Sequence, residues 1–490
     1  MHKKLLWIVV ASLLLAACAS VKNPVTGEDE LSVLDEQSEI ALGRKEHGEV
    51  LKEYGVYQNA RLQSYVSELG QRLARQSHRQ NLTWHFTVLD SPEINAFALP
   101  GGYVYVTRGI MAYMDSEADL AGVIGHEIGH VTARHGAQRA TRQQTAGIGV
   151  LAASILGAIL EGSGVSGAGQ VASKASQGLA ASYIASYGRD QELQADRLGA
   201  EYLSRINLDP KNMVDVIGVL KNQERFADDT ARAEGRTPPA RAGWLASHPS
   251  NDQRLQDIVR IAGQYKGNYG DEGRSRYLQA IDGMTFGESR EQGVTRGRNF
   301  YHEPLGIALT APEGWKIRNS QEAIALLNAA GDAGLIVSVL PAKAGSTHDE
   351  IIRNVIKPAQ GRSERRSLNG LPATHFTGTG QNQQAIEATV TSGPANLNYL
   401  LVYAAKNPSA LQRARTKIEE AEASFRALTS ADRAAARPWT IRTVPYRRGS
   451  LPQLARESPL AGNAEQQLRL LNGVYSGGDL PAGQLIKVIE

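Results

Sequence analysis

The chain has 490 residues, of which 42% are hydrophobic and 21% are charged, the composition of an ordinary globular protein. The formal net charge of +3 is too small to indicate a nucleic-acid-binding surface, so no nucleic-acid partner is expected. This length predicts several domains with sizeable hydrophobic cores.

The N-terminus has the pattern of a lipoprotein signal. Two lysines precede an apolar run, and residues 15–18, Leu-Ala-Ala-Cys, form a lipobox, in which the cysteine receives a lipid. Cys18 is the only cysteine in the chain, so neither disulfides nor thiolate metal ligands are expected. This start resembles bacterial lipoproteins, which implies a cleaved signal peptide at residues 1–17, a tether at 18–30, and an outer-membrane anchor that faces the periplasm.

The next segment predicts a small sheet beside helices. Residues 31–80 have apolar side chains at helical spacing, whereas residues 83–90 and 103–107 have β-like patterns. A Pro-Gly-Gly turn directly precedes the second strand. Two interpretations of that strand remain open. It is either an interior strand or a sheet edge that binds an extended substrate through Gly101, Gly102, Tyr103 and Val104.

The central motif is His126-Glu127-Ile128-Gly129-His130. Ser116 and Asp119 form a helix-capping pattern before it, so the motif is expected within a helix. Residues four apart share a helix face, so His126 and His130 can bind one zinc ion with Glu127 beside them as general base. His135 follows His126 by about 900° of helix rotation, on the opposite face, and is not expected to be a ligand. The alternative is a core helix with two incidental histidines.

A tetrahedral zinc site needs a further protein ligand. Glu192 and Asp196 lie four apart in a helical segment; Glu192 would bind the metal, and Asp196 would accept a hydrogen bond from a ligand imidazole. The alternative is two solvated carboxylates on an amphipathic helix. Between these motifs lies a Gly/Ala/Ser-rich region, residues 145–187. Its apolar part is too short for a membrane span, and it predicts either a buried helix over the site or a membrane-surface contact.

Four motifs, at residues 95–102, 126–130, 192–196 and 247–254, resemble in this order the HtpX and CAAX-prenyl-protease family of zinc metallopeptidases. The resemblance covers residues 23–265 and is closest to soluble periplasmic members. It implies zinc ligands at His126, His130 and Glu192, with Glu127 as the catalytic base. It also places His248 and Arg254 in the family's His-Pro-x-x-x-x-Arg segment. Their expected role is stabilisation of the oxyanion, with His248 as a fourth, blocking zinc ligand as the alternative.

The C-terminal half changes in pattern. Residues 266–295 are polar and predict a linker. Residues 296–430 combine strand-like and helical runs, which predicts a small α+β interaction domain similar to PsbP-type domains. Residues 437–490 follow the order strand, helix, helix, strand and resemble a degenerate LysM module, a class that binds the glycan of peptidoglycan. The usual Gly-Asp-Thr opening is replaced by residues 449–451, Gly-Ser-Leu.

We therefore predict an α+β protein, with a mainly helical zincin-like metalloprotease domain and a small sheet at residues 31–265, then a small α+β domain and a LysM-like βααβ module. The expected function is that of a zinc endopeptidase with one Zn²⁺ per chain, tethered to the outer membrane through Cys18. Its substrates would be unfolded or misassembled envelope proteins. Two alternatives remain open: a non-catalytic or latent chaperone or adaptor for outer-membrane assembly, and a peptidoglycan-binding envelope protein.

Overall fold

The computed structural model describes residues 19–142, 187–233, 252–320, 323–381, 383–460 and 462–490, together with Gly235, Trp244 and His248. The chain divides into two compact units, and the second, residues 285–439, is inserted into the sequence of the first. None of the described helices combines the length and apolar character that a membrane span requires. Two predictions lie outside the described residues: the signal peptide with its lipid site at Cys18, and the apolar stretch within residues 145–186.

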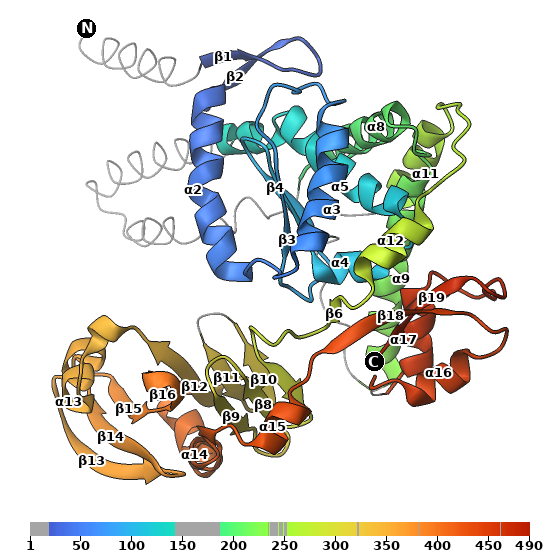
Figure 1. The fold of residues 1–490 in the computed structure, drawn as a ribbon. Helices are drawn as coiled ribbons and strands as arrows, with labels where there is room; N and C mark the ends of the chain where they lie inside the picture. Colours follow the sequence, from blue (N-terminus) through green and yellow to red (C-terminus); the bar gives the residue numbers. More distant parts are fainter. Residues whose placement is uncertain are drawn as a thin grey trace, which may run out of the picture. The chain divides into compact units, whose positions relative to one another are not determined.

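The first unit surrounds a three-stranded sheet with helices (Figure 1). The strand order is β3-β5-β4, with β3 parallel and β4 antiparallel to β5. The elements of this unit are β1 (Ala19–Lys22), β2 (Asp29–Ser32), α2 (Glu36–Tyr54), α3 (Ala60–Ala74), β3 (His85–Leu89), β4 (Ala96–Leu99), β5 (Tyr103–Thr107), α4 (Arg108–Tyr113), α5 (Glu117–Thr132), α8 (Arg189–Arg205), α9 (Asn212–Ala233), α11 (Asp252–Ala262), α12 (Arg274–Ile281), β18 (Trp439–Pro445), α16 (Leu451–Glu457), α17 (Ala464–Leu471) and β19 (Leu485–Ile489).

Strand β5 is an interior strand, which decides between the two interpretations of residues 103–107. It pairs with β3 on one side and β4 on the other, and all five of its side chains are buried. The backbone of Tyr103 and Val104 is therefore unavailable to a substrate, and this part of the prediction is wrong. Gly101 and Gly102 instead form the turn before β5, with φ of +82° and +94°. A Cβ on Gly101 would lie 2.7 Å from Ile40 Cα, so the tight approach of α2 requires glycine there.

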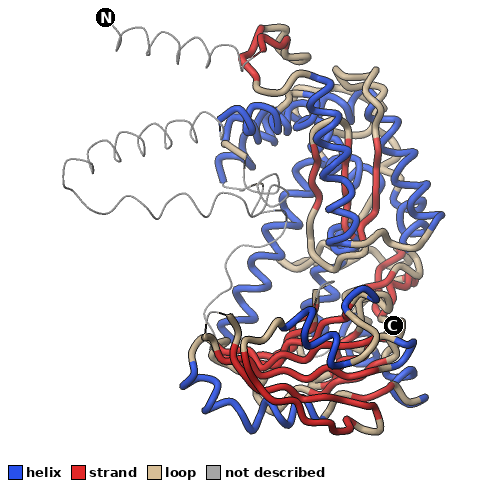
Figure 2. The backbone as a smooth tube through the Cα atoms, turned by 90° about the vertical axis from the view of Figure 1, so that its left-hand side faces the viewer, coloured by secondary structure: helices blue, strands red, loops and turns tan. Residues whose placement is uncertain are grey.

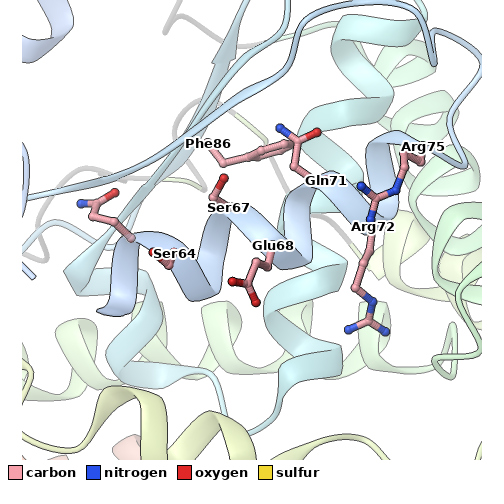
Figure 3. Close-up of a pocket in the computed structure, with 8 residues that line it drawn as sticks. Ser64, Ser67, Glu68, Gln71, Arg72, Arg75 and Phe86 are labelled. Carbon is pink, nitrogen blue, oxygen red and sulfur yellow. The ribbon is translucent and has the colours of Figure 1, made fainter. Parts of the chain in front are cut away.

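The β3 edge of the sheet is covered by side chains of α3. Gln63 Nε2 donates to Val88 O at 2.8 Å, and Gln63 Oε1 accepts from Val88 N at 3.0 Å, as a neighbouring strand would. Gln71 lies beside Phe86 in the surface cavity of about 750 Å³ over α3 and β3 (Figure 3). Among the described strands, none pairs with the outer edge of β4, although the four residues of this strand are buried.

The N-terminal segment forms a docked hairpin, which corrects the prediction of a tether at residues 18–30. Strands β1 and β2 pair antiparallel from Ala19 to Ser32. Asn23, at the turn, donates from Nδ2 to Ala133 O at 3.4 Å, and Val33 N donates to Thr141 Oγ1 at 3.1 Å. The turn of this hairpin and the residue that follows it thus contact the segment at and after the C-terminal end of α5.

The end of the chain belongs to the same unit as the metal motif. The predicted linker at 266–295 contains α12, whose Tyr277, Leu278 and Ile281 are buried, so that prediction is wrong for its first half. Strands β18 and β19 pair antiparallel with α16 and α17 between them in sequence. Helix α17 packs against α9 and α4. The βααβ segment therefore contributes to the core of the first unit, and glycan binding by it stays a prediction.

The second unit consists of sheets and helices (Figure 2), which confirms the α+β class together with the first unit. A seven-stranded antiparallel sheet has the order β10-β11-β12-β16-β15-β14-β13, and a smaller sheet contains β17-β9-β8-β7. Helix α14 packs against β12 and β16. The elements are β6 (Thr285–Phe286), β7 (Val294–Arg296), β8 (Asn299–His302), β9 (Ile307–Thr310), β10 (Lys316–Asn319), β11 (Ile324–Leu327), β12 (Ala333–Leu340), η1 (Ala342–Ala344), α13 (His348–Ile351), η2 (Ile352–Ile356), β13 (Gln360–Leu368), β14 (Leu371–Thr379), β15 (Ala385–Ser392), η3 (Pro394–Asn396), β16 (Asn398–Ala405), α14 (Pro408–Ala423), β17 (Arg426–Ala427) and α15 (Ser430–Ala435).

Candidate metal centre

Helix α5 begins at the predicted capping pattern and carries the central motif. Ser116 Oγ accepts from Asp119 N at 3.0 Å, and Asp119 Oδ2 accepts from Ser116 N at 3.1 Å, which satisfies two backbone donors at the helix start. Every residue of α5 is buried. His126 and His130 lie on one face, with their Nε2 atoms 3.0 Å apart. The predicted geometry of the two histidines is thus present.

Glycines allow α8 to approach α5 closely. A Cβ on Gly129 would lie 3.0 Å from Ala195 O, and a Cβ on Gly199 would lie 3.1 Å from His126 N. Any larger residue would push the helix backbones apart. This close crossing brings Glu192 and Asp196 of α8 against the histidines of α5, so they are not the solvated carboxylates of the alternative interpretation.

Four donors converge on one point: His126, His130, Glu192 and His248, whose ligand atoms all lie within 4.8 Å of one another. The Nε2 atoms of His126 and His130 are 3.6 Å and 3.5 Å from the Glu192 oxygens, and His248 Nδ1 is 3.2 Å from His126 Nε2. In a tetrahedral zinc site with bonds of about 2.0–2.1 Å, ligand atoms lie about 3.3 Å apart. The donor set therefore fits zinc, and His248 lies where a fourth ligand would lie.

A second layer of polar residues holds these donors. Asp196 Oδ1 lies 2.8 Å from His126 Nδ1, the two atoms between which the sequence predicts a hydrogen bond, and that hydrogen bond stays a prediction. Arg254 is buried, and its Nε and Nη2 donate to the two Asp196 oxygens at 2.8 Å. Its Nη1 donates to His248 O at 3.1 Å and lies 2.9 Å from Glu192 Oε2. In this conformation Arg254 holds the ligand set together and does not point at a free position where an oxyanion would form.

Glu127 is buried beside the four donors. Its Oε1 accepts a hydrogen bond from Trp244 Nε1 at 3.0 Å and lies 3.4 Å from His248 Nε2. Its Oε2 has no hydrogen-bond partner among the residues that the structure describes. Trp244 itself is fixed by its backbone N, which donates to Ile94 O at 2.8 Å just before β4. Glu127, the predicted base, thus lies at the site with one oxygen hydrogen-bonded and the other without a partner among the described residues.

Burial determines the charges at this centre. It raises the pKa of Glu192 to about 7 and also raises that of Glu127. It lowers the pKa of His130 well below its usual range and that of His248 to about 3, so both rings are neutral at neutral pH. Burial opposes ionisation of Asp196 too, but Arg254 holds its pKa below the usual range. Burial thus opposes ionisation of Glu192 and Glu127 beside neutral imidazoles, and a divalent cation would add to the charge of the nearby Arg254 in stabilising these carboxylates.

Two residues of the site were not predicted from the sequence. Trp244 precedes His248 by one helical turn, and His248 N donates to Trp244 O at 2.7 Å. The only sequence signal was an aromatic residue four positions before the His-Pro pair. His135 lies against His130, with the two Nδ1 atoms 2.8 Å apart, although continued helical rotation would have placed it on the opposite face.

Comparisons with known proteins agree with this geometry. The sequence pattern of peptidase family M48 matches residues 60–262. The chain is 31% identical over 253 residues to the beta-barrel assembly-enhancing protease of Yersinia pestis, a match that covers 47% of this chain and 49% of the relative. It is 30% identical over 239 residues to the protein of the same name from Escherichia coli K12, covering 49% of this chain and 45% of the relative.

Two further matches are a mitochondrial metalloendopeptidase and a solved structure of low similarity. The mitochondrial metalloendopeptidase OMA1 of Bos taurus is 27% identical over 254 residues, covering 49% of this chain and 46% of the relative. This chain thus spans about half the length of the curated relatives that it matches. The solution structure of cyanobacterial PsbP from Synechocystis covers 28% of this chain and 98% of that protein at 13% identity, but the TM-score of 0.20 supports no argument.

The matched residues contain α5 and α8 with the four converging donors, the buried Glu127 and Arg254. Residues 60–262 are therefore a metallopeptidase domain of peptidase family M48.

Proposed function

We propose that the chain is a zinc-dependent endopeptidase of the bacterial envelope that hydrolyses unfolded or misassembled envelope proteins. The observation that carries this proposal is the buried set His126, His130, Glu192 and His248 with Glu127 beside it. The name of the two bacterial relatives, beta-barrel assembly-enhancing protease, supports a substrate class related to outer-membrane assembly. The lipobox at Cys18 supports a lipid anchor in the outer membrane.

His126, His130 and Glu192 would hold the zinc ion. When bound, zinc supplies a Lewis acid that polarises the scissile carbonyl and lowers the pKa of water. Glu127 Oε2, which has no partner among the described residues, accepts the proton from the attacking water and then passes it to the leaving amine. Asp196 orients His126 through Nδ1, and Arg254 holds Asp196 and Glu192 in register. Arg254 thus acts as a positioning residue in this proposal.

The substrate would bind along β4, which replaces the sequence-based choice of residues 101–104. Helix α5 packs more extensively on β4 than on β5, and the outer edge of β4 has no partner strand among the described residues. An extended peptide paired with this edge would run past the end of the strand at Ile94, where Trp244 is bound. The other sheet edge, at β3, is covered by Gln63 and Gln71.

The resting site is closed by its own fourth donor. A catalytic zinc site keeps one position open for water or substrate, whereas His248 completes the set here. We therefore place His248 as a blocking ligand that must leave before turnover, in preference to the oxyanion role. A non-catalytic chaperone or adaptor function is the alternative that this closed geometry also favours.

The test is degradation of an unfolded protein by the soluble chain that begins after Cys18, with zinc content measured in the same sample. Wild type should contain one zinc and cleave, Glu127→Gln should contain zinc and not cleave, and His248→Ala should cleave faster than wild type. Zinc without cleavage in both wild type and His248→Ala would favour the chaperone role. Cleavage by Glu127→Gln would refute its role as base, and folded protein without zinc would refute the metal centre.

A further inference from the structure

His135 lies between the two helices that supply the metal donors. Its side chain is fully buried, and its Nδ1 lies 2.8 Å from His130 Nδ1. On the other side of the ring, His135 Nε2 lies 2.9 Å from Gln194 Oε1. Gln194 is on α8, two residues after Glu192. One imidazole therefore joins a ligand of α5 to the helix that carries the third ligand.

A left-handed residue explains why His135 reaches this place. Helix α5 ends at Thr132, and Arg134 has φ of +59°, which interrupts the regular helical rotation. The Arg134 side chain stabilises this turn, because its Nε donates to Glu39 at 3.1 Å and its Nη2 donates to Leu34 O at 2.6 Å. The turn returns His135 to the face of α5 that carries His130.

The donor geometry fixes where each proton lies. His130 directs Nε2 at the other donors, so a neutral His130 that binds a metal through Nε2 carries its proton on Nδ1. That N–H must donate to His135 Nδ1, which is then unprotonated. A neutral His135 consequently carries its proton on Nε2 and donates it to Gln194 Oε1. Each hydrogen bond in this series has only one direction that is compatible with metal binding by His130.

We infer that His135 is a positioning residue that holds His130 in its metal-binding tautomer, with Gln194 fixing the tautomer of His135 in turn. The inference rests on the proposed zinc site. It gives the two histidine ligands different partners, since Asp196 contacts His126 Nδ1 at 2.8 Å. The ring of Tyr187 stacks on His130 with centroids 3.9 Å apart, which fixes the ring plane but does not select a nitrogen. His135 itself is outside the converging donor set and is not a ligand.

The test compares His135→Leu with His135→Asn, because the two substitutes have nearly the same shape and only asparagine offers an acceptor where Nδ1 was. Zinc affinity is measured by competition with a chelator, and the absorption spectrum is recorded for the cobalt-substituted protein. His135→Leu should weaken zinc binding by about 10- to 100-fold and shift the cobalt spectrum, as loss of an outer partner of a ligand does. His135→Asn should recover most of the affinity and the wild-type spectrum.

Substitutions of Gln194, which is half-buried, test the direction of these hydrogen bonds. Gln194→Glu keeps only acceptors and should retain zinc affinity, whereas Gln194→Leu should weaken it. If His135→Leu lowers the melting temperature of the metal-free protein, the Gln194 pair decides the question. Wild-type affinity in His135→Leu, equal losses in His135→Leu and His135→Asn, or loss in Gln194→Glu would overturn the inference. Absence of zinc in wild type would instead refute the proposed function.

Discussion

Replacement of Lys487 by methionine should loosen the start of the catalytic helix. Lys487 lies in β19 and is fully buried, and its Nζ donates to Ala112 O at 3.0 Å and to Met114 O at 2.7 Å. It also forms an ion pair with Asp115 Oδ1 at 3.0 Å. These acceptors immediately precede Ser116, the N-cap of α5. Methionine fills a similar volume without a donor, so Lys487→Met leaves two buried carbonyl groups and a carboxylate without this partner.

The size of the effect follows from these contacts. A hydrogen bond to a charged group contributes about 1.5–3 kcal/mol, and removal of one member of a buried ion pair costs about 3–5 kcal/mol. The lower part of this range applies, because the Asp115 side chain is 24% exposed and also lies 3.4 Å from Arg274. We expect a loss of about 2–4 kcal/mol in the stability of this region. Amide hydrogen exchange within residues 112–125 should then be roughly 30- to 1,000-fold faster.

Hydrogen exchange read by mass spectrometry suits a chain with two units, since it reports each segment separately. The matched control is Lys211→Met, at an exposed lysine of the same unit. The control should leave exchange in residues 112–125 unchanged. Wild-type exchange there in Lys487→Met would refute the reasoning, and would mean that the C-terminal segment is a separate module beside the peptidase domain.

Three further predictions concern the metal helix, its base and the second unit. Gly129→Val should reduce zinc binding because the valine side chain would collide with α8. The control Gly218→Ala, at a position with open space around it, should keep full zinc content. Equal zinc content in both variants would contradict the close-packing argument. Trp244→Phe keeps an aromatic ring but frees Glu127 Oε1, so basal cleavage should rise several-fold in a peptidase assay; a fall would show that the indole supports catalysis. Burial lowers the pKa of His302 to about 4 from 6.5. The unfolded state therefore binds the proton first, and stability falls by at most about 3 kcal/mol as pH drops from about 6.5 to 4. Calorimetric scans should show that His302→Gln loses less stability than wild type between pH 6.5 and 4. An identical loss of stability in both proteins would contradict this.

The two histidines of the donor set were predictable because their arrangement depends on local geometry alone. His126 and His130 need only a helix, and Ser116 with Asp119 supplies a visible start for it. Glu192 was undecided from periodicity alone, since a surface helix shows the same spacing of carboxylates. Gly129, within the motif, allows α8 to approach, but this role can be recognised only once the partner helix is known.

The failures of prediction have a common physical origin, which is long-range contact. Tyr103–Thr107 has the pattern of a strand, but whether a strand lies at an edge depends on pairings of β3 and β4 that periodicity does not report. His135 was placed on the wrong face because rotation by 100° per residue does not continue through the left-handed conformation of Arg134. The polar composition of residues 266–284 concealed α12, whose core partners lie elsewhere in the sequence.

The catalytic helix is held at both ends by segments remote from it in sequence. At its start, Lys487 of β19 binds the carbonyl groups of Ala112 and Met114. At its end, Arg79 donates from Nη1 to Val131 O at 3.1 Å, and Asn23 of the N-terminal hairpin donates to Ala133 O at 3.4 Å. A helix that carries two of the four converging donors gains rigidity from such contacts, because its own last carbonyl groups have no partner within the helix. The 155 residues of the second unit, from Thr285 to Trp439, are therefore inserted between two parts of the first unit, and both parts contact the ends of α5.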